Sequence, residues 1–381
     1  MGGVSMEWKE DVLGNVLEVK YGKDHKKLAD GQYPVYGSGG LMRYVDSKLY
    51  DGPSILIPRK GTLNNIMFVE SPFWTVDTMF WSIINTDKVD PKFLFYSICK
   101  RDFASMNVGS AVPSMTVNIL NDIQISYPKN IEDQRRIASI LSSLDRKIEL
   151  NNKINADLEE MAQAIFKNWF VDFEPFKNGK FVDSELGMIP EGWKVGRLTE
   201  IASYMNGLAM QKFPPENNED SLPVLKIKEL GQGFCGTDSD RCSCNIKDEC
   251  KIHNGDVIFS WSGTLLVDVW CGGDCGLNQH LFKVTSKDYP KWFYYYWTKH
   301  HLQEFIHIAK DKAVTMGHIK RGHLEEAMVA IPDNDSMEKA HELFEPILSK
   351  MISLRLESSR LSLLRDTLLP RLMSGELEVP E

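Results

Sequence analysis

Short apolar runs alternate with turn residues over two stretches of the chain, residues 7–130 and 190–334. Gly, Pro, Asn and Asp separate these runs, as they do between the strands of a mixed α+β domain. Examples are the runs at 54–58, 123–127, 256–261 and 281–284. Two aromatic segments, 93–96 and 292–297, predict short helices whose rings pack in the core rather than stack on bases.

A different pattern follows each stretch, because apolar residues now recur in steps of four and three, as in a heptad seam. The polar seam residues Asn151, Asn155 and Ser358 would help to fix the register of such helices. The predicted helix-pairing residues are Ile137, Leu141, Leu144, Ile148, Leu158 and Ile165 in the first helix and Ile347, Met351, Leu354, Leu361 and Leu368 in the second.

The ends of both helices can be predicted as well. Asn130 is placed to cap the first helix, a capping-box pattern at 335–338 predicts the start of the second, and Pro370 should disrupt it. About 30–34 helical residues would span roughly 45–50 Å. One turn of B-DNA spans about 34–36 Å. One helix closes each half, so we expect an antiparallel pair within the chain; the alternative is a general dimerisation coiled coil.

The chain also repeats itself. Trp8, Leu13 and Val16 reappear after a shift of 185 as Trp193, Leu198 and Ile201. The shift grows to 202 between Gly61 and Gly263 and to 204 between Pro128 and Pro332, so the second copy contains insertions, and a cysteine-rich stretch lies in one of them. The sequence therefore predicts an α+β fold in which two domains, 1–130 and 179–334, alternate with two long helical segments, 131–178 and 335–381.

The composition restricts the class of protein. Hydrophobic content of 43% and charged content of 25% are typical of a globular chain, and no apolar run reaches the length of a membrane span. The residues at the start lack the basic and apolar regions of a signal peptide, so we expect none, and the seven cysteines fit a reducing cytoplasm. A net charge of −9 argues against a protein coated in positive charge, but local basic clusters can still bind nucleic acid.

Catalytic motifs are missing from the sequence. Gly231, Gly233 and Gly236 have the spacing of a dinucleotide-binding loop, but the residues that follow do not predict a helix. The chain has neither a Walker A lysine motif nor the Asn/Asp-Pro-Pro-Tyr/Phe motif of adenine methyltransferases. We therefore expect no catalytic centre in this chain.

Four segments resemble type I restriction–modification specificity subunits. The segment at 131–149 resembles the start of their central helical region, and 158–173 resembles its end. The Ile-Pro-Glu-Gly-Trp-Lys run at 189–194 resembles the opening of a second target-recognition domain, and 364–377 resembles the C-terminal helical end. These segments follow in order along the whole chain, so the resemblance is specific.

The resemblance implies a division of labour. Two target-recognition domains would each read half of an asymmetric, split double-stranded DNA site, while the helices space them and dock two methyltransferase subunits. Motor–nuclease subunits would complete the assembly. S-adenosylmethionine, ATP and Mg²⁺ would belong to the partner subunits, and this chain would hold no cofactor.

Candidate DNA contacts occur at matching places in the two copies. In the first, Arg59 suits guanine, and Lys60 and Thr62 suit phosphate, in a turn that we expect to be exposed. The second copy has Ser262 and Thr264 in the same turn but lacks the charges, and His280 is expected to be structural. Further candidates are Lys23, His25, Lys26, Lys27, Arg43, Ser110 and Ser114 in the first copy and Lys226, Lys228, Lys310, Lys312, His318, Lys320 and Arg321 in the second.

Two alternatives remain open at this level. The cysteines at 242, 244, 250, 271 and 275, with His253, suggest zinc, but their spacing matches no standard zinc motif, so reduced structural cysteines and no metal are the prediction. The functional alternatives are a coiled-coil scaffold that binds only proteins and, less favoured, an autonomous nuclease or methyltransferase.

Overall fold

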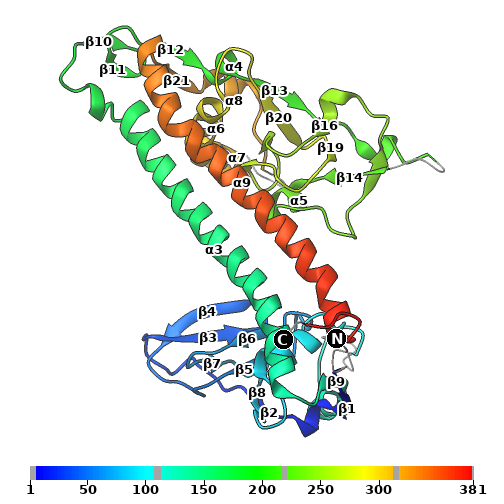
Figure 1. Ribbon diagram of the computed structural model, residues 1–381. Helices are drawn as coiled ribbons and strands as arrows, with labels where there is room; N and C mark the ends of the chain where they lie inside the picture. Colours follow the sequence, from blue (N-terminus) through cyan, green and yellow to red (C-terminus); the bar gives the residue numbers. More distant parts are fainter. Residues whose placement is uncertain (1–5, 107–112, 217–220, 312–316, 380–381) are drawn as a thin grey trace. The chain divides into compact units, whose positions relative to one another are not determined.

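The computed structural model describes residues 6–106, 113–216, 221–311 and 317–379. The chain divides into two compact units. Unit 1 contains Met1–Lys147 and Leu361–Glu381, and unit 2 contains Ile148–Arg360. Helices α3 (Ile131–Phe170) and α9 (Asn334–Met373) contribute to both units (Figure 1).

Unit 1 is built on two small sheets and one strand pair. The four-stranded sheet has the order β2-β8-β5-β6, the three-stranded sheet has the order β4-β3-β7, and β1 pairs with β9. The strands are β1 (Trp8–Val12), β2 (Leu17–Tyr21), β3 (Tyr33–Gly37), β4 (Gly40–Val45), β5 (Ser54–Pro58), β6 (Met67–Val69), β7 (Trp74–Thr75), β8 (Met79–Ile84) and β9 (Gln124–Pro128). The helices α1 (Pro91–Ile98) and α2 (Val117–Asn121) complete the unit, with the first part of α3 and the end of α9.

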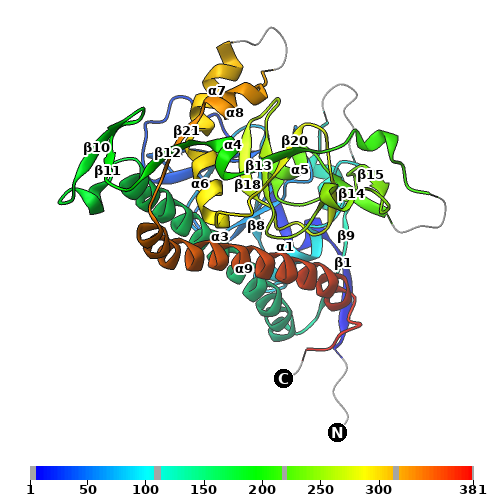
Figure 2. The same ribbon diagram turned by 90° about the horizontal axis from the view of Figure 1, so that it is seen from above.

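Unit 2 repeats this plan. Its sheets have the orders β13-β20-β17-β18 and β15-β14-β19-β16, and β12 pairs with β21. The strands are β12 (Lys194–Arg197), β13 (Ser203–Asn206), β14 (Ser221–Leu225), β15 (Arg241–Ser243), β16 (Lys251–Ile252), β17 (Val257–Ser260), β18 (Leu266–Val269), β19 (Cys275–Leu277), β20 (Leu281–Thr285) and β21 (Met328–Ile331). The short helices are α4 (Leu198–Ile201), α5 (Ile227–Gln232), α6 (Lys291–His300), α7 (Leu302–Asp311) and α8 (Arg321–Glu326) (Figure 2).

The internal repeat is confirmed at the level of backbone hydrogen bonds. Three backbone hydrogen bonds made by residues that follow β1 and β2 recur between matching residues of unit 2. The matched donor–acceptor pairs are Leu13–Ile123 and Leu198–Ala327, Gly22–Met79 and Gly207–Leu281, and Lys23–Thr75 and Leu208–Leu277. The strand β16 extends the sheet that has three strands in unit 1; its pair Ile252–Cys275 corresponds to the isolated bridge Tyr50–Phe73 of unit 1. A separate hairpin, β10 (Phe181–Ser184) with β11 (Gly187–Pro190), precedes the second copy.

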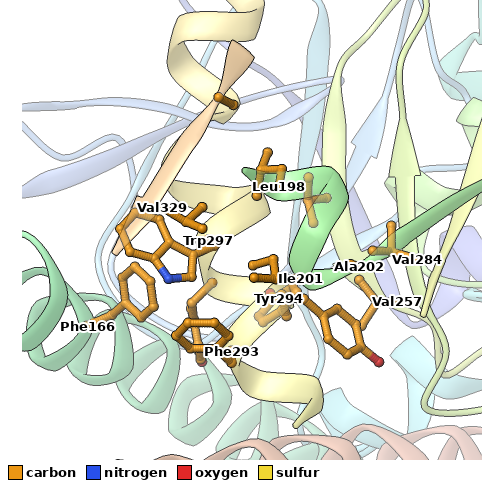
Figure 3. Packing of buried hydrophobic residues seen from close by; sticks show 14 of the residues in the cluster. Phe166, Leu198, Ile201, Ala202, Val257, Val284, Phe293, Tyr294, Trp297 and Val329 are labelled. Atoms are coloured by element: carbon orange, nitrogen blue, oxygen red, sulfur yellow. The ribbon is translucent and has the colours of Figure 1, made fainter. Parts of the chain in front are cut away.

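The aromatic segments form short helices that are buried, as predicted. In unit 2 the six side chains from Trp292 to Trp297 on α6 are all buried. Phe166 of α3 lies against Trp297, with ring centroids 5.1 Å apart, and both join Phe293, Leu198 and Ile201 in one apolar cluster (Figure 3). Such burial is a major source of folding free energy, so α3 is part of the core of unit 2.

The two long helices pair within each unit. In unit 1 the Arg365 guanidinium donates to Asp145 at 2.7 Å. In unit 2 the Asn151 amide donates to Glu357 at 2.9 Å, and Phe166 contacts Phe344 with ring centroids 6.2 Å apart. Residues that lie later in α3 have partners that lie earlier in α9. The two helices are therefore antiparallel.

Two predictions concern the caps of these helices. Asn130 does cap α3, because its side chain accepts from the Glu132 N–H at 3.0 Å. The cap of α9 is not the 335–338 pattern, since the helix begins at Asn334 and Asp333 accepts from the Ser336 N–H at 2.8 Å.

The helices also extend further than predicted. Each has 40 residues, about 60 Å, instead of 30–34 residues. Pro370 does not end α9, which continues to Met373. A proline this close to a C-terminus removes only a bond of the last turn, and Gly375, with a φ of 73°, follows the actual end.

Candidate nucleic-acid interface

In unit 1 the turn after β5 pairs with a segment that lies more than 50 residues later. The Met115 N–H donates to Arg59 O at 2.9 Å, and the Gly61 N–H donates to Pro113 O at 3.3 Å. Lys60 and Ser114 lie opposite each other in an isolated β-bridge. Two segments that were predicted separately are therefore joined at one place, which we call the unit 1 junction (59–62 and 113–115).

Unit 2 has the same arrangement. The Ile319 N–H donates to Trp261 O at 3.1 Å, and the Gly263 N–H donates to Gly317 O at 2.9 Å. Ser262 and His318 form the matching β-bridge. This unit 2 junction (261–264 and 317–319) repeats each backbone contact of the first, so the main chain of the candidate site is duplicated.

A glycine is required in both turns. Gly61 has a φ of 88° and Gly263 a φ of 67°, where a side chain costs about 1–2 kcal/mol. A Cβ on Gly61 would also lie 2.9 Å from Ser38 Oγ, whereas a Cβ on Gly263 would lie 3.4 Å from Ile227 Cδ1. The unit 1 turn is therefore packed more tightly against its neighbours.

The side chains of the two junctions differ. The Arg59 guanidinium lies 5.4 Å from the centroid of the exposed Tyr21 ring and donates to Asp77 O at 3.2 Å. At the matching position of unit 2, the Trp261 ring contacts His280 and His318, with centroids 6.1 and 6.3 Å away. A cation–aromatic pair in one unit thus corresponds to an aromatic–imidazole cluster in the other.

The predicted contact residues have mixed surroundings. Lys60, Thr62, Thr264 and His318 are exposed at the junctions, whereas Ser262 is only 8% exposed, and Ser114 lies opposite Lys60. Lys320 and Arg321 lie exposed at the start of α8. Ser110 and Lys312 lie outside the described residues.

Several predicted cations already have protein partners. Arg43 donates to Leu28 O at 2.8 Å and pairs with Asp30 at 3.3 Å, so it holds the exposed loop that carries Lys26 and Lys27. Lys226 and Lys228 form ion pairs with Asp240 and Asp238. The hydrogen bond to Asp238 raises the pKa of Lys228.

Sequence reasoning missed a groove in unit 2 that lies next to these lysines. It has a volume of about 670 Å³, and its polar lining comes from Lys226, Lys228, Gln211, Asp240, Arg241, Asn278, Gln279 and His280. The amides and the arginine were not singled out, and His280 was expected to be structural, although it is exposed. The internal repeat could have pointed to two of these residues. Gln279 and His280 match Asp77 and Thr78, which lie beside the unit 1 junction.

The cysteines lie mainly in apolar surroundings. Cys242 and Cys250 belong to one buried cluster and Cys275 to another. Burial raises the pKa of the Cys242, Cys250 and Cys271 thiols, which disfavours the thiolate that zinc needs. Across the described ranges no three His, Cys, Asp or Glu side chains are grouped so that they could hold a metal ion.

The predicted helix-pairing residues differ in burial, and two on each helix are fully buried. Ile137, Leu141, Met351 and Leu354 are buried, and the other predicted positions are partly exposed: Leu144, Ile148, Leu158, Ile165, Ile347, Leu361 and Leu368. In unit 2 the most buried face of α3 instead contains Ala162, Phe166 and Phe170. That face packs on α6 as well as on α9, so a two-helix seam does not describe it fully.

A polar layer interrupts the pair in unit 2. Asn151, Asn155 and Ser358 are all at least 91% buried. Both polar side-chain atoms of Asn155, Asn151 Oδ1 and Ser358 Oγ have no hydrogen-bond partner among the described residues. Buried groups of this kind lower stability but can fix register.

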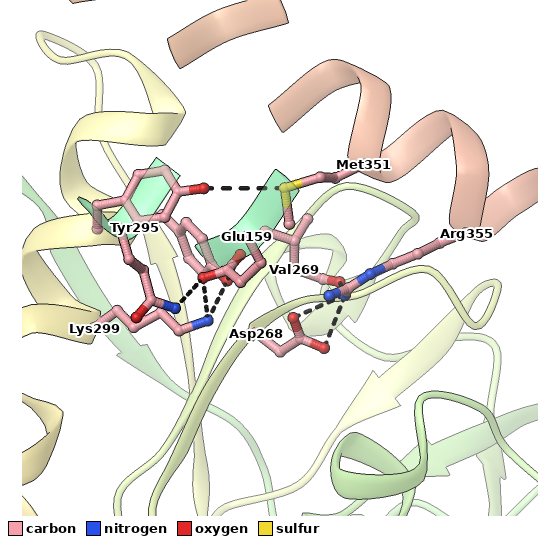
Figure 4. A network of polar contacts seen from close by, with 9 residues as sticks. Glu159, Asp268, Val269, Tyr295, Lys299, Met351 and Arg355 are labelled. Carbon is pink, nitrogen blue, oxygen red and sulfur yellow. Dashed lines mark hydrogen bonds and ion pairs between the residues drawn. The ribbon is translucent and has the colours of Figure 1, made fainter. Parts of the chain in front are cut away.

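A second polar network joins the helices to the sheet and to α6. Arg355 of α9 donates to both carboxylate oxygens of Asp268, at 2.8 and 2.9 Å, and Glu159 of α3 accepts from Lys299 at 2.6 Å (Figure 4). Tyr295 donates to the same glutamate at 3.4 Å. In unit 1 the matching Tyr96 donates to Asp145 of α3 at 2.5 Å. Both units therefore fasten their aromatic helix to α3 through a tyrosine and a carboxylate.

Comparison with known proteins identifies the class to which this fold and interface belong. A family model described as the type I restriction modification DNA specificity domain matches residues 6–160 and again 190–354. The chain therefore belongs to the family of type I restriction–modification specificity subunits.

Individual relatives agree with this assignment. The chain is 30% identical to the type I restriction enzyme MjaIX specificity subunit of Methanocaldococcus jannaschii, over 93% of this chain and 86% of the relative. It is 21% identical to the HindI specificity subunit of Haemophilus influenzae, over 82% and 83%. The crystal structure of a type I system S subunit from M. genitalium has the same fold, with a TM-score of 0.61, 15% identity and coverage of 100% and 98%.

These findings confirm the predicted family and fold class. Among the helices of the described residues, none combines the length and the apolar character that a membrane crossing requires.

Proposed function

We propose that this specificity subunit reads an asymmetric, bipartite double-stranded DNA site and carries no catalytic centre. Each unit reads one half of the site through the face that contains its junction. The two half-sites differ in sequence, so the site is not a palindrome.

One observation carries this proposal: the junction backbone is duplicated while its side chains are not. Lys60 corresponds to Ser262, and Arg59 corresponds to Trp261, on identical main-chain hydrogen bonds. Side chains on a shared scaffold determine which bases are read, because base edges are recognised by hydrogen bonds and apolar contacts. A protein that reads two different half-sites needs the same backbone in both units and different side chains on it.

The helices have a separate role in this proposal. α3 and α9 set the spacing between the half-sites and dock two methyltransferase subunits, and the polar layer at Asn151, Asn155 and Ser358 keeps their register. S-adenosylmethionine, ATP and Mg²⁺ are bound by the methyltransferase and motor–nuclease subunits of the assembly.

Methylome sequencing of cells with and without this chain tests the proposal. We expect one adenine-methylated bipartite motif to disappear when the chain is absent. Loss of no motif, together with failure of the reconstituted complex to protect any DNA sequence, would favour a scaffold that binds only proteins. Methylation or cleavage by the chain alone would show that it is an enzyme.

A further inference from the structure

The groove of unit 2 has the chemistry of a base-reading surface. Its lining combines the amides of Gln211 and Gln279 with the Arg241 guanidinium and the His280 imidazole. Glutamine can bind adenine, and arginine guanine, through two hydrogen bonds in the major groove. Gln279 is partly exposed. Its Nε2 lies 3.3 Å from His280 Nε2, and its buried Oε1 has no hydrogen-bond partner among the described residues, so the fold leaves this amide partly unsatisfied beside the groove.

A buried carboxylate holds two segments beside the groove together. Glu229 on α5 is 3% exposed, and it accepts from the Lys226 N–H at 3.2 Å and from the Ser239 hydroxyl at 3.1 Å. These two bonds tie the segment with Lys226 to the segment with Asp238 and Asp240. A site held in this way can keep its reading groups in place without DNA.

The cations at the groove are restrained rather than free. Lys226 pairs with Asp240, and Lys228 pairs with Asp238. Each ion pair is exposed to solvent and therefore weak, so a DNA phosphate can compete with the aspartate for the lysine. The aspartates lower non-specific attraction to DNA and leave more of the discrimination to the uncharged amides.

The groove is continuous with the unit 2 junction. The Trp261 N–H donates to His280 O at 3.4 Å, and the two rings are in contact. His280 therefore lines the groove and also touches the junction. In unit 1 the positions that match Gln279 and His280 are Asp77 and Thr78, so the two units present different hydrogen-bonding groups at this place.

We propose that this groove, with Gln279 and Gln211 as specificity-determining residues, reads base pairs of the half-site that belongs to unit 2. The proposal rests on the bipartite function stated above and names the surface that performs it in one unit. Gln279 makes a base contact, and Lys226 and Lys228 exchange their aspartates for phosphates when DNA binds.

The test uses the chain assembled with its methyltransferase subunits and a DNA library with randomised half-sites. Methylated molecules are sequenced for the wild type, for Gln279→Leu, and for Gln303→Leu, an exposed glutamine on α7 outside the groove lining, as the control. We expect Gln279→Leu to reduce the preference at a base pair of the unit 2 half-site about ten-fold or more and to leave the other half-site unchanged. The control should keep the wild-type profile.

The outcomes separate the two proposals. A wild-type profile without two half-sites would contradict the proposed function itself. A normal wild-type profile with an unaltered or uniformly weakened profile for Gln279→Leu would overturn base reading by the groove. If Gln279→Leu fails to fold, Gln211→Leu replaces it with the same criterion, because Gln211 is exposed in the short 3-10 helix Met210–Lys212. Asp240→Asn should strengthen binding to all sequences and steepen its salt dependence, since it releases Lys226; no change in either would contradict the phosphate exchange.

Discussion

The two junctions share their main chain but not their chemistry. In unit 1 a charged turn, with Arg59 over the Tyr21 ring, is packed tightly around Gly61. In unit 2 the same turn is uncharged, Trp261 lies beside two imidazoles, and a polar groove adjoins it. The duplicated backbone thus keeps the position of the junction, while its side chains differ between the two units; under the proposed function this difference gives each unit its own specificity.

The largest expected effect comes from breaking the junction backbone. Gly61→Ala should lower the free energy of unfolding by about 2–3 kcal/mol, because it combines a positive φ with a 2.9 Å approach to Ser38. Gly263→Ala should cost only about 1 kcal/mol, since its φ suits the left-handed region and its nearest contact is 3.4 Å. Urea denaturation measures both, and equal losses would contradict the difference in packing.

The next effect concerns the tyrosines that fasten each aromatic helix. Tyr96→Phe removes a 2.5 Å bond to the Asp145 carboxylate and should cost about 1.5 kcal/mol. Tyr295→Phe removes a longer bond to Glu159 and the bond from Lys299 at 3.0 Å, but Glu159 and Lys299 stay paired with each other, so the loss should be smaller, about 1 kcal/mol. Urea denaturation measures the free energy of unfolding of both variants. A larger decrease for Tyr295→Phe than for Tyr96→Phe would contradict this ranking.

A smaller effect compares charge at the junctions. If Lys60 holds phosphate, Lys60→Ala should reduce the slope of log K against log salt by about 1 in DNA binding by the assembled complex. Ser262→Ala, at the matching position, should leave the slope unchanged. An unchanged slope for Lys60→Ala would show that Lys60 does not contact phosphate, and a reduced slope for Ser262→Ala would contradict the difference between the two junctions.

The smallest effect is a pH dependence confined to unit 1. Asp11 accepts from Lys9 at 2.8 Å and from Asn15 at 2.6 Å, and these contacts lower its pKa, whereas the matching residue of unit 2 is Gly196. Because the pKa of Asp11 is lower in the folded state, its carboxylate stabilises the fold at any pH above the unfolded-state pKa of about 3.9. This contribution is lost as the pH falls below that value.

Asp11→Asn should therefore be less stable than wild type at pH 7, by under about 1 kcal/mol, because the contact is near the surface. The difference should narrow as the pH falls from 5 to 2. Urea midpoints across this range provide the measurement, with Asp183→Asn at an exposed position as the control. A difference that widens toward low pH would have the wrong sign.

The sequence predicted the parts of the fold that depend on periodic patterns. The repeat from Trp8 to Trp193, the α3 cap at Asn130 and the burial of the 292–297 helix all follow from apolar spacing or local hydrogen bonding. The end of α9 was not predicted correctly. Pro370 was expected to disrupt the helix as a proline in a helix interior does, although it lies in the last turn. The seam was displaced toward Phe166 and Phe170 because α6 packs on the same helix, a contact that no local pattern encodes.

The candidate site was only partly accessible to sequence reasoning. Lys60 and Ser114 were each chosen, but only the fold joins them in a bridge. Gln211, Arg241 and Gln279 come from separate segments, and no spacing rule connects them. A groove formed by residues distant in sequence therefore requires the fold before its chemistry can be recognised.

The central claim is that each unit specifies its own half-site, and a domain exchange tests it most directly. Residues 7–130 are replaced with the first domain of another specificity subunit, and the DNA methylated by the resulting complex is sequenced. We predict that one half-site changes to that of the donor while the other half-site and the spacer length remain. A change in both half-sites, or in neither, would contradict the account.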